Sequence, residues 1–383
     1  MKWKTAGTAG TVLAAAAVLT TAAPAVAAPD TGYGTASLQR DVDALEAVGI
    51  VGVQARVSVK GERDLVAVSG RASVRSQRPV PKNGYFRIAS TSKTYVAAVV
   101  AQLADQGKLS LDDTVEKWLP GVVKGNGNDG SAITVRQILQ HTAGLPDGLP
   151  YYQTVKEWRE HRFDRYTDKQ LVERAMKLKP LFKPGEGWMY SNAGYNLAGM
   201  LIEKVTGNPW QKEVERRITR PLGLSRTLWG GDWTHMPQPH ARAYRQFTDG
   251  LEDVTSHGDG DASGALISTT SEVNRFFRAL FGGKVLSAEA LAEMKKTVPT
   301  PIFEKYMPGA RYGLGISSRP LPCGGTYWGH GGNDLGYSTK QAVTEDGSRA
   351  VTVSMSSQST DEATARRVQN TVDKLIESAL CDK

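Results

Sequence analysis

Strand patterns stand near both ends of this chain, with helical patterns between them. Apolar and polar residues alternate strictly from Val51 to Lys60, which indicates an antiparallel strand with one buried face, and residues 65–71 follow as its partner. Far downstream, residues 337–344 and 349–355 flank an Asp346-Gly347 turn, the pattern of a β-hairpin. One sheet must therefore be assembled from the two termini around an inserted helical region, so we predict an α+β fold.

Glycines mark the C-terminal ends of two predicted helices. Residues 191–206 end at Gly207, and residues 271–281 end at Gly282-Gly283. A helix opened by Ser90 is apolar on nearly every side, which predicts burial between layers. A last helix is predicted by one apolar stripe, formed by Val368, Val372, Leu375, Ile376 and Ala379.

The first 28 residues have the pattern of an export signal. Lys2 and Lys4 precede an apolar stretch at 11–20, and small residues end at Ala28. We expect cleavage there and a secreted mature chain of residues 29–383. No later run approaches the roughly 20 apolar residues of a spanning helix, so no membrane span is predicted.

The charge is mildly basic. The formal charge of +8 falls to +6 without Lys2 and Lys4 of the signal. No basic block is interleaved with aromatic residues, so nucleic-acid binding is not predicted, and the charge is a surface bias or a weak attraction to an anionic cell wall.

The cysteines are Cys323 and Cys381. In an exported chain two cysteines indicate one disulfide, and two free thiols are the alternative.

Three motifs occur once each in the order that a serine acyl-transfer site requires: Ser90-Thr91-Ser92-Lys93, Tyr190-Ser191-Asn192 and His330-Gly331-Gly332. Serine three residues before lysine on a helix places both side chains on one face, so that Lys93 can exchange a proton with the Ser90 hydroxyl. Tyr190 can relay a proton to a leaving group, and Asn192 offers an amide to a substrate peptide group.

Taken singly, each motif also has a structural interpretation. Ser90 and Lys93 alone fit a helix cap with a solvated lysine, Tyr190 and Asn192 a packed turn, and His330 a tight bend. We interpret the glycines after His330 as positions where a ligand approaches the backbone closely. Neither a Gly-x-Ser-x-Gly elbow nor metal-ligand spacing of histidines occurs in the sequence, so no metal or cofactor is predicted.

With these motifs the chain resembles the serine β-lactamase and penicillin-binding protein superfamily, and within it the secreted D-alanyl-D-alanine carboxypeptidases. The likeness runs from about Asp41 to the C-terminus and includes residues 85–88, 134–139, 141–145 and 201–204. It implies an antiparallel sheet flanked by helices, an inserted all-helical lobe at roughly 110–255, and a site between the two.

The resemblance also implies roles for individual residues. Ser90 becomes the acylated nucleophile, Lys93 its proton partner, and Tyr190 the acid for the departing D-alanine. The substrate cleft is shaped by Asn192, His330, Gly331, Gly332 and Asn333, where the N–H groups of Ser90 and Asn333 form the oxyanion hole. The family's disulfide matches Cys323 and Cys381.

Three departures from the family pattern concern specificity. Gly331 and Asn333 stand where the family has threonines, and Ser317 where it has an arginine that binds the substrate carboxylate. We consider Arg319 as a replacement for that arginine. A cleft tryptophan of the family falls near Asp259.

The leading hypothesis is therefore a secreted, monomeric serine carboxypeptidase that removes D-alanine from peptidoglycan stem peptides, with β-lactams as covalent inhibitors. The alternatives are an esterase, a D-amino-acid peptidase or a class C-like β-lactamase of the same mechanism. A non-catalytic penicillin-binding module is a third possibility, against which the joint presence of Ser90, Lys93 and Tyr190 argues.

Overall fold

The computed structural model describes residues 1–5, 7, 32–231, 233–258 and 260–381. Most of the predicted export signal, and Asp259, therefore lie outside the described residues. Contacts divide the chain into two units, Met1–Thr31 and Gly32–Lys383, and the helices and strands of the described residues all belong to the second unit.

One antiparallel sheet of ten strands joins the two ends of the chain, as predicted. Its order is β11-β12-β13-β14-β16-β17-β1-β2-β3, and β15 pairs with β16 beside this path. Both predicted hairpins are confirmed, since Val57 lies opposite Leu65 and Val343 opposite Ala350. The strands of this sheet are β1 (Gly52–Val59), β2 (Leu65–Ser73), β3 (Ser76–Pro79), β11 (Val298–Pro299), β12 (Arg311–Tyr312), β13 (Ser317–Pro320), β14 (Thr326–Gly329), β15 (Gly332–Asn333), β16 (Ser338–Thr344) and β17 (Arg349–Met355).

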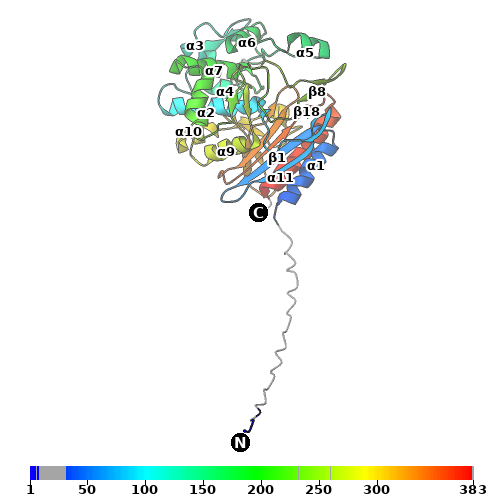
Figure 1. Cartoon of the computed structure of the whole chain (residues 1–383). Helices are drawn as coiled ribbons and strands as arrows, with labels where there is room; N and C mark the ends of the chain where they lie inside the picture. The colour runs from blue at the N-terminus through cyan, green and yellow to red at the C-terminus, as the bar shows by residue number, and fades with distance from the viewer. Residues whose placement is uncertain (6, 8–31, 232, 259, 382–383) are drawn as a thin grey trace. The chain divides into compact units, whose positions relative to one another are not determined.

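Helices cover both faces of the central strands (Figure 1). Helices α1 (Thr35–Ala47) and α11 (Glu362–Cys381) pack on one face, and α9 (Thr270–Phe281) packs on the other. The expectation that β1 has a solvated polar face is wrong. Asn274 of α9 donates to Arg56 O and Ser58 Oγ, each at 3.1 Å, so hydrogen bonds satisfy that face under a helix.

The helix that carries the first motif lies in the core. Residues Ala89–Thr91 form a 3₁₀ turn, η1, and α2 (Ser92–Asp105) continues from it with nearly every side chain buried. The other predicted helices are present as α7 (Ala193–Thr206), α9 and α11. The remaining helices are α3 (Val115–Trp118), η2 (Gly130–Ala132), α4 (Val135–Gln140), α5 (Val155–His161), α6 (Asp168–Ala175), α8 (Trp210–Val214), η3 (Glu215–Thr219), α10 (Ala288–Met294) and η4 (Pro301–Phe303).

The span 110–255, predicted as a helical lobe, holds α3 to α8 together with short strands. Small sheets and strand pairs involve β4 (Phe86–Arg87), β5 (Lys124–Gly125), β6 (Asn128–Asp129), β7 (Leu228–Trp229), β8 (Tyr244–Phe247), β9 (Gly250–Asp253), β10 (Leu266–Ser268) and β18 (Ser357–Gln358). Because β4 pairs with β10, the strand just before Ser90 is fixed to a segment far along the chain.

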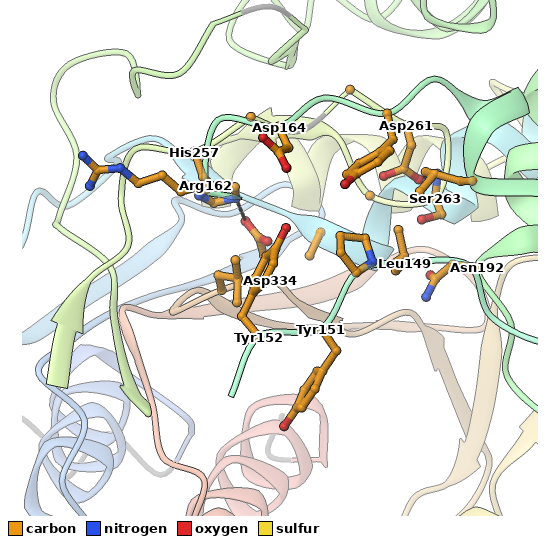
Figure 2. Close-up of a pocket in the computed structure, with 18 of the residues that line it drawn as sticks. Leu149, Tyr151, Tyr152, Arg162, Asp164, Asn192, His257, Asp261, Ser263 and Asp334 are labelled. Carbon is orange, nitrogen blue, oxygen red and sulfur yellow. Dashed lines mark hydrogen bonds and ion pairs between the residues drawn. The ribbon is translucent and has the colours of Figure 1, made fainter. Parts of the chain in front are cut away.

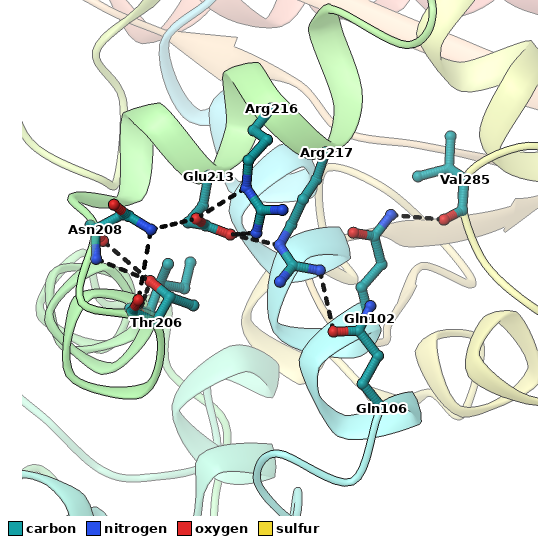
Figure 3. Close-up of polar contacts among 9 residues, drawn as sticks. Gln102, Gln106, Thr206, Asn208, Glu213, Arg216, Arg217 and Val285 are labelled. Carbon is teal, nitrogen blue, oxygen red and sulfur yellow. Dashed lines mark hydrogen bonds and ion pairs between the residues drawn. The ribbon is translucent and has the colours of Figure 1, made fainter.

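A buried carboxylate connects this span to the far end of α2 (Figure 3). Glu213 is 1% exposed and accepts from Arg216 at 2.7 Å and Arg217 at 2.5 Å. Arg217 also donates to Gln106, one residue beyond α2, at 3.3 Å. Since a buried ion pair needs all its partners, this cluster fixes the register between α8 and α2.

The predicted disulfide is present. Cys323 and Cys381 are bonded, with a Cα–Cα distance of 5.7 Å, and the bond closes a loop of 58 residues between the sheet and α11. Among the described residues, no helix has the length and apolar character needed to cross a bilayer.

Candidate active site

The Ser-x-x-Lys and Tyr-x-Asn motifs meet at the side chain of Lys93. Its Nζ lies 3.0 Å from Ser90 Oγ, 2.7 Å from Asn192 Oδ1 and 2.8 Å from the carbonyl oxygen of Ser263. Lys93 is 0% exposed, so these oxygens compensate the desolvation of its amine. They hold Nζ beside the one hydroxyl that the sequence identified as a nucleophile.

Asn192 has a fixed orientation in this arrangement. Its Nδ2 donates to Asp147 Oδ2 at 2.7 Å, which leaves Oδ1 to face Lys93. Asp147 follows residues 141–145 in the sequence. The tertiary structure brings it to Asn192, 45 residues further along the chain.

The predicted nucleophile, Ser90, follows a strained turn. Ala89 has a φ of 48°, in the left-handed region that residues with a Cβ seldom adopt. The turn leaves Ser90 partly exposed while Thr91, Ser92 and Lys93 are buried. Strain of this kind is typical of functional sites, where packing around the turn holds the conformation.

Tyr190 lies against the same amine. Lys93 Nζ is 4.9 Å from the centre of its ring. Burial raises the pKa of the Tyr190 phenol, interaction with the Ser90 hydroxyl lowers it in part, and the charges of Asp147 and Asp261 raise it further. Among the described residues, Tyr190 Oη has no partner at normal hydrogen-bond geometry. The resting group is therefore a neutral phenol with a proton to donate.

Backbone packing requires one of the two glycines after His330. A Cβ on Gly332 would lie 2.0 Å from the carbonyl oxygen of Ile88, so only glycine lets β15 approach the turn that precedes Ser90. At Gly331 the nearest atom to such a Cβ would be 3.4 Å away, an ordinary contact. Close packing of β15 on the residue before η1 accounts for Gly332, and ligand approach at Gly331 and Gly332 stays a prediction.

His330 belongs to a buried chain of hydrogen bonds. Ser191 N donates to His141 Nδ1 at 3.2 Å, His141 Nε2 lies 3.2 Å from Tyr312 Oη, and Tyr312 Oη lies 2.8 Å from His330 Nε2. His330 Nδ1 contacts Gly331 O. Because the first donor is a backbone N–H, all the following protons point the same way, and the chain ends with His330 Nδ1–H donating to Gly331 O.

The electrostatics keep both histidines neutral. Burial and the charge of Lys93 lower the pKa of His330 to about 3, and the same causes hold the pKa of His141 well below its ordinary value. His330 therefore positions the strand segment that contains Asn333 and does not exchange protons near neutral pH.

A cavity of about 290 Å³ opens beside Ser90 (Figure 2). Ala89, Ser90, Asn192 and Asn333 line it at the motif end. Its other lining residues come from the loops around 149–166 and 257–264, together with Arg245 and Asp334. In Figure 2, Asn192, Ser263 and Asp261 lie at one end, and Arg162 and His257 at the other. Of the predicted site residues, the structure thus brings Ser90 and Asn192 to the cavity with Asn333, and places Lys93, Tyr190 and His330 behind them.

The family's arginine position and the replacement considered for it do not line the cavity. Ser317 Oγ donates to the carbonyl oxygen of Gly329 at 3.0 Å. Arg319 forms an ion pair with Asp373 of α11 at 2.8 Å, which contradicts its proposed role as the replacement arginine. Lys340, beneath Gly331, donates to Gln369 of α11 at 2.9 Å. None of these three lines the cavity. Arg319 and Lys340 instead contact α11, which covers the other face of the sheet.

Several site residues were not found from the sequence. The Ser263 carbonyl has no sequence signature, since any residue supplies one. His141 lies in a segment that supported the family resemblance, yet its partner Tyr312 is 171 residues away and no spacing connects them. Asp168 and Asp261 share the amide of Asn196, a contact between three separate segments.

Comparison with known proteins agrees with this geometry. The family model described as Beta-lactamase matches residues 38–375. The structure of a D-stereospecific amidohydrolase from a Streptomyces species superposes with a TM-score of 0.81 and 38% identity, covering 92% of this chain and 99% of that one. The D-amino acid amidase of Ochrobactrum anthropi SV3, in its complex with L-phenylalanine amide, superposes with a TM-score of 0.76 and 28% identity, covering 89% and 96%.

A curated relative extends the comparison. Penicillin-binding protein 4* of Bacillus subtilis strain 168 is 29% identical over 286 residues, which are 70% of this chain and 60% of that protein. The chain thus spans less than two thirds of this relative's length. The match to the family model covers most of the chain, so this protein belongs to the serine β-lactamase and penicillin-binding protein superfamily and is a serine hydrolase of that family.

Proposed function

We propose that this protein hydrolyses amide bonds formed by the carboxyl group of D-amino acids, through an acyl-enzyme on Ser90. The observation that carries the proposal is the Ser90–Lys93–Asn192 cluster beside a cavity that neither Ser317 nor Arg319 lines, so the family's carboxylate-binding position supplies no cation there. An amidase needs no such cation, because its leaving group is ammonia or an amine. The likeness to a D-stereospecific amidohydrolase and to a D-amino acid amidase supports the same substrate class.

The proposed first step uses the contact between Ser90 and Lys93. Once the Lys93 ammonium has released a proton, Ser90 Oγ attacks the substrate carbonyl carbon and its own proton passes to Lys93 Nζ, 3.0 Å away. The N–H groups of Ser90 and Asn333 receive the developing oxyanion. As the C–N bond breaks, Tyr190 gives its proton to the leaving nitrogen and takes one back from Lys93. Water then hydrolyses the Ser90 ester by the reverse proton transfers and releases the D-amino acid.

The second candidate is the D-alanyl-D-alanine carboxypeptidase predicted from the sequence. It is favoured by the likeness to penicillin-binding protein 4* and by the same catalytic cluster. A carboxypeptidase would need another group to bind the terminal carboxylate of the substrate, since Ser317 and Arg319 do not supply one. Under either candidate we propose that β-lactams acylate Ser90 and that the substrate is a D-amino-acyl compound such as a peptidoglycan stem peptide. We also propose that the mature chain, from about residue 29, is secreted as a monomer.

The deciding experiment is a substrate panel on the purified mature protein. The panel compares D- and L-phenylalanine amide, an N-acylated D-Ala-D-Ala peptide and a simple 4-nitrophenyl ester, each with wild type and Ser90→Ala. We expect turnover of the D-amide well above the L-amide, no turnover by Ser90→Ala, and an adduct on Ser90 in the mass spectrum after exposure to benzylpenicillin. Preference for the D-Ala-D-Ala peptide selects the carboxypeptidase, and preference for the ester rejects both amide-cleaving candidates. Turnover that persists in Ser90→Ala rejects the mechanism.

A further inference from the structure

Asp261 stands out among the carboxylates near Ser90 because one of its oxygens is unused. Its Oδ1 accepts from Asn196 Nδ2 at 2.9 Å and from Ser263 N at 2.7 Å. Within the described residues, Asp261 Oδ2 has neither a hydrogen bond nor an ion pair. Asp261 is 7% exposed and lines the cavity, so this oxygen belongs to a carboxylate that is more than nine-tenths buried.

The other nearby carboxylates already have partners. Asp147 uses Oδ1 for Leu149 N at 3.2 Å and Oδ2 for Asn192. Asp334 forms ion pairs with His257 at 3.1 Å and Arg87 at 3.7 Å. Asp164 pairs with His161 at 2.8 Å. Asp164 is exposed to solvent and Asp334 contacts two basic side chains, so among the described residues Asp261 is the largely buried carboxylate of the cavity wall that has an acceptor to offer a ligand.

Asp261 shares an amide donor with a second carboxyl group, that of Asp168. One amide group, Asn196 Nδ2, donates to both Asp261 and Asp168 at 2.9 Å, and Asp168 also accepts from Ala262 N at 2.8 Å. Burial and the charge of Asp261 raise the pKa of Asp168 to about 7. Asp168 is therefore largely protonated in mildly acidic conditions.

A buried carboxylate without a cation is costly unless a ligand supplies one. Ser263, two residues after Asp261, accepts the Lys93 hydrogen bond through its carbonyl, so this segment reaches the acylation site directly. Figure 2 places Asp261 at the same end of the cavity as Asn192 and Ser263, away from Arg162. A cation bound there would sit on a short substituent close to the scissile carbonyl.

We propose that Asp261 binds the free α-ammonium group of the substrate, so that the enzyme acts on D-amino-acyl groups with an unblocked amine. The inference rests on the proposed amidohydrolase function and deepens it. The carbonyl at Ser90, the ammonium at Asp261 and the leaving group at Tyr190 define three points of attachment. With these fixed, the two enantiomers direct their side chains differently, so Asp261 also contributes to selection of the D form.

The test compares two substrates that differ only in that charge: D-phenylalanine 4-nitroanilide and its N-acetyl derivative. Asp261→Asn keeps an oxygen for Asn196 and Ser263 N and removes the negative charge. We expect kcat/KM for the free-amine substrate to fall about 10- to 100-fold, the range of a lost charge-assisted hydrogen bond. The N-acetyl substrate should change less than about 3-fold, and the ratio of D to L turnover should decrease.

Asp164→Asn is the matched control, because it removes a negative charge from the same cavity wall while Asp261 is kept. It should leave the ratio of the two substrates unchanged. Equal losses on both substrates in Asp261→Asn would mean that Asp261 only supports the loop, and would overturn the inference. If wild type hydrolyses the N-acetyl substrate faster than the free amine, the inference also fails while the proposed amidohydrolase stands. If wild type hydrolyses neither, the proposed function itself fails.

Discussion

Replacement of Asp168 by asparagine should remove a pH-dependent loss of stability. The Asp168 carboxyl is buried next to Asp261, and burial together with that charge raises its pKa from 3.8 to about 7. Between these values the folded protein holds a proton that the unfolded chain has released. Stability from this group is therefore complete below about pH 4 and is lost as the pH rises toward 7.

The magnitude follows from the shift. One pKa unit corresponds to about 1.4 kcal/mol, so a shift of about three units predicts a loss of about 4 kcal/mol in the free energy of unfolding between pH 4 and pH 8. Asparagine retains an oxygen for Ala262 N and Asn196 Nδ2, the two donors at 2.8 and 2.9 Å, and carries no titratable proton.

Urea unfolding followed by tryptophan fluorescence at pH 5, 6, 7 and 8 gives the measurement. As the pH rises, the urea midpoint of wild type should fall relative to that of Asp168→Asn. The two midpoints should therefore converge or cross. Asp164→Asn, at an exposed carboxylate, serves as the control for general charge effects. Midpoints that stay parallel for wild type and Asp168→Asn across this range would refute the argument for a buried, protonated Asp168.

Tyr312→Phe leaves His330 without its donor in a buried site, and we expect a loss of about 1–3 kcal/mol in the free energy of unfolding together with a lower kcat. Unchanged stability in urea would contradict this. Replacing Cys323 and Cys381 by serine opens a loop of 58 residues and should cost roughly 4 kcal/mol, measured as a lower unfolding midpoint that matches reduced wild type. The pKa of His330 is lowered to about 3, so the pH profile of kcat/KM should show no ionisation of this histidine above about pH 4. An ionisation between pH 5 and 7 that disappears in His330→Gln would contradict this prediction.

The catalytic cluster illustrates how far sequence patterns reach. Ser90 and Lys93 are three positions apart at the start of a helix, so helical geometry alone brings their side chains together. Local patterns likewise specified the hairpins, because alternation and turn residues act over a few neighbours. Unique motifs in a fixed order then connected Tyr190, Asn192 and His330 to the same chemistry.

Specificity was beyond the reach of the sequence. Arg319 was a reasonable substitute for a lost arginine, but strand alternation turns its side chain toward Asp373 on the opposite face. The glycines after His330 indicated close approach without indicating what approaches, and only packing identified the backbone before Ser90 as the neighbour of Gly332.

The sequence by itself determined the fold class, and its motifs predicted the nucleophile and its proton partners, because periodicity and short motifs encode local geometry. Only the tertiary structure decided which carboxylates are satisfied, which histidines stay neutral and where a substrate charge finds a partner. These properties depend on burial and on contacts such as those of Asn196 with Asp168 and Asp261, between segments that no local pattern connects.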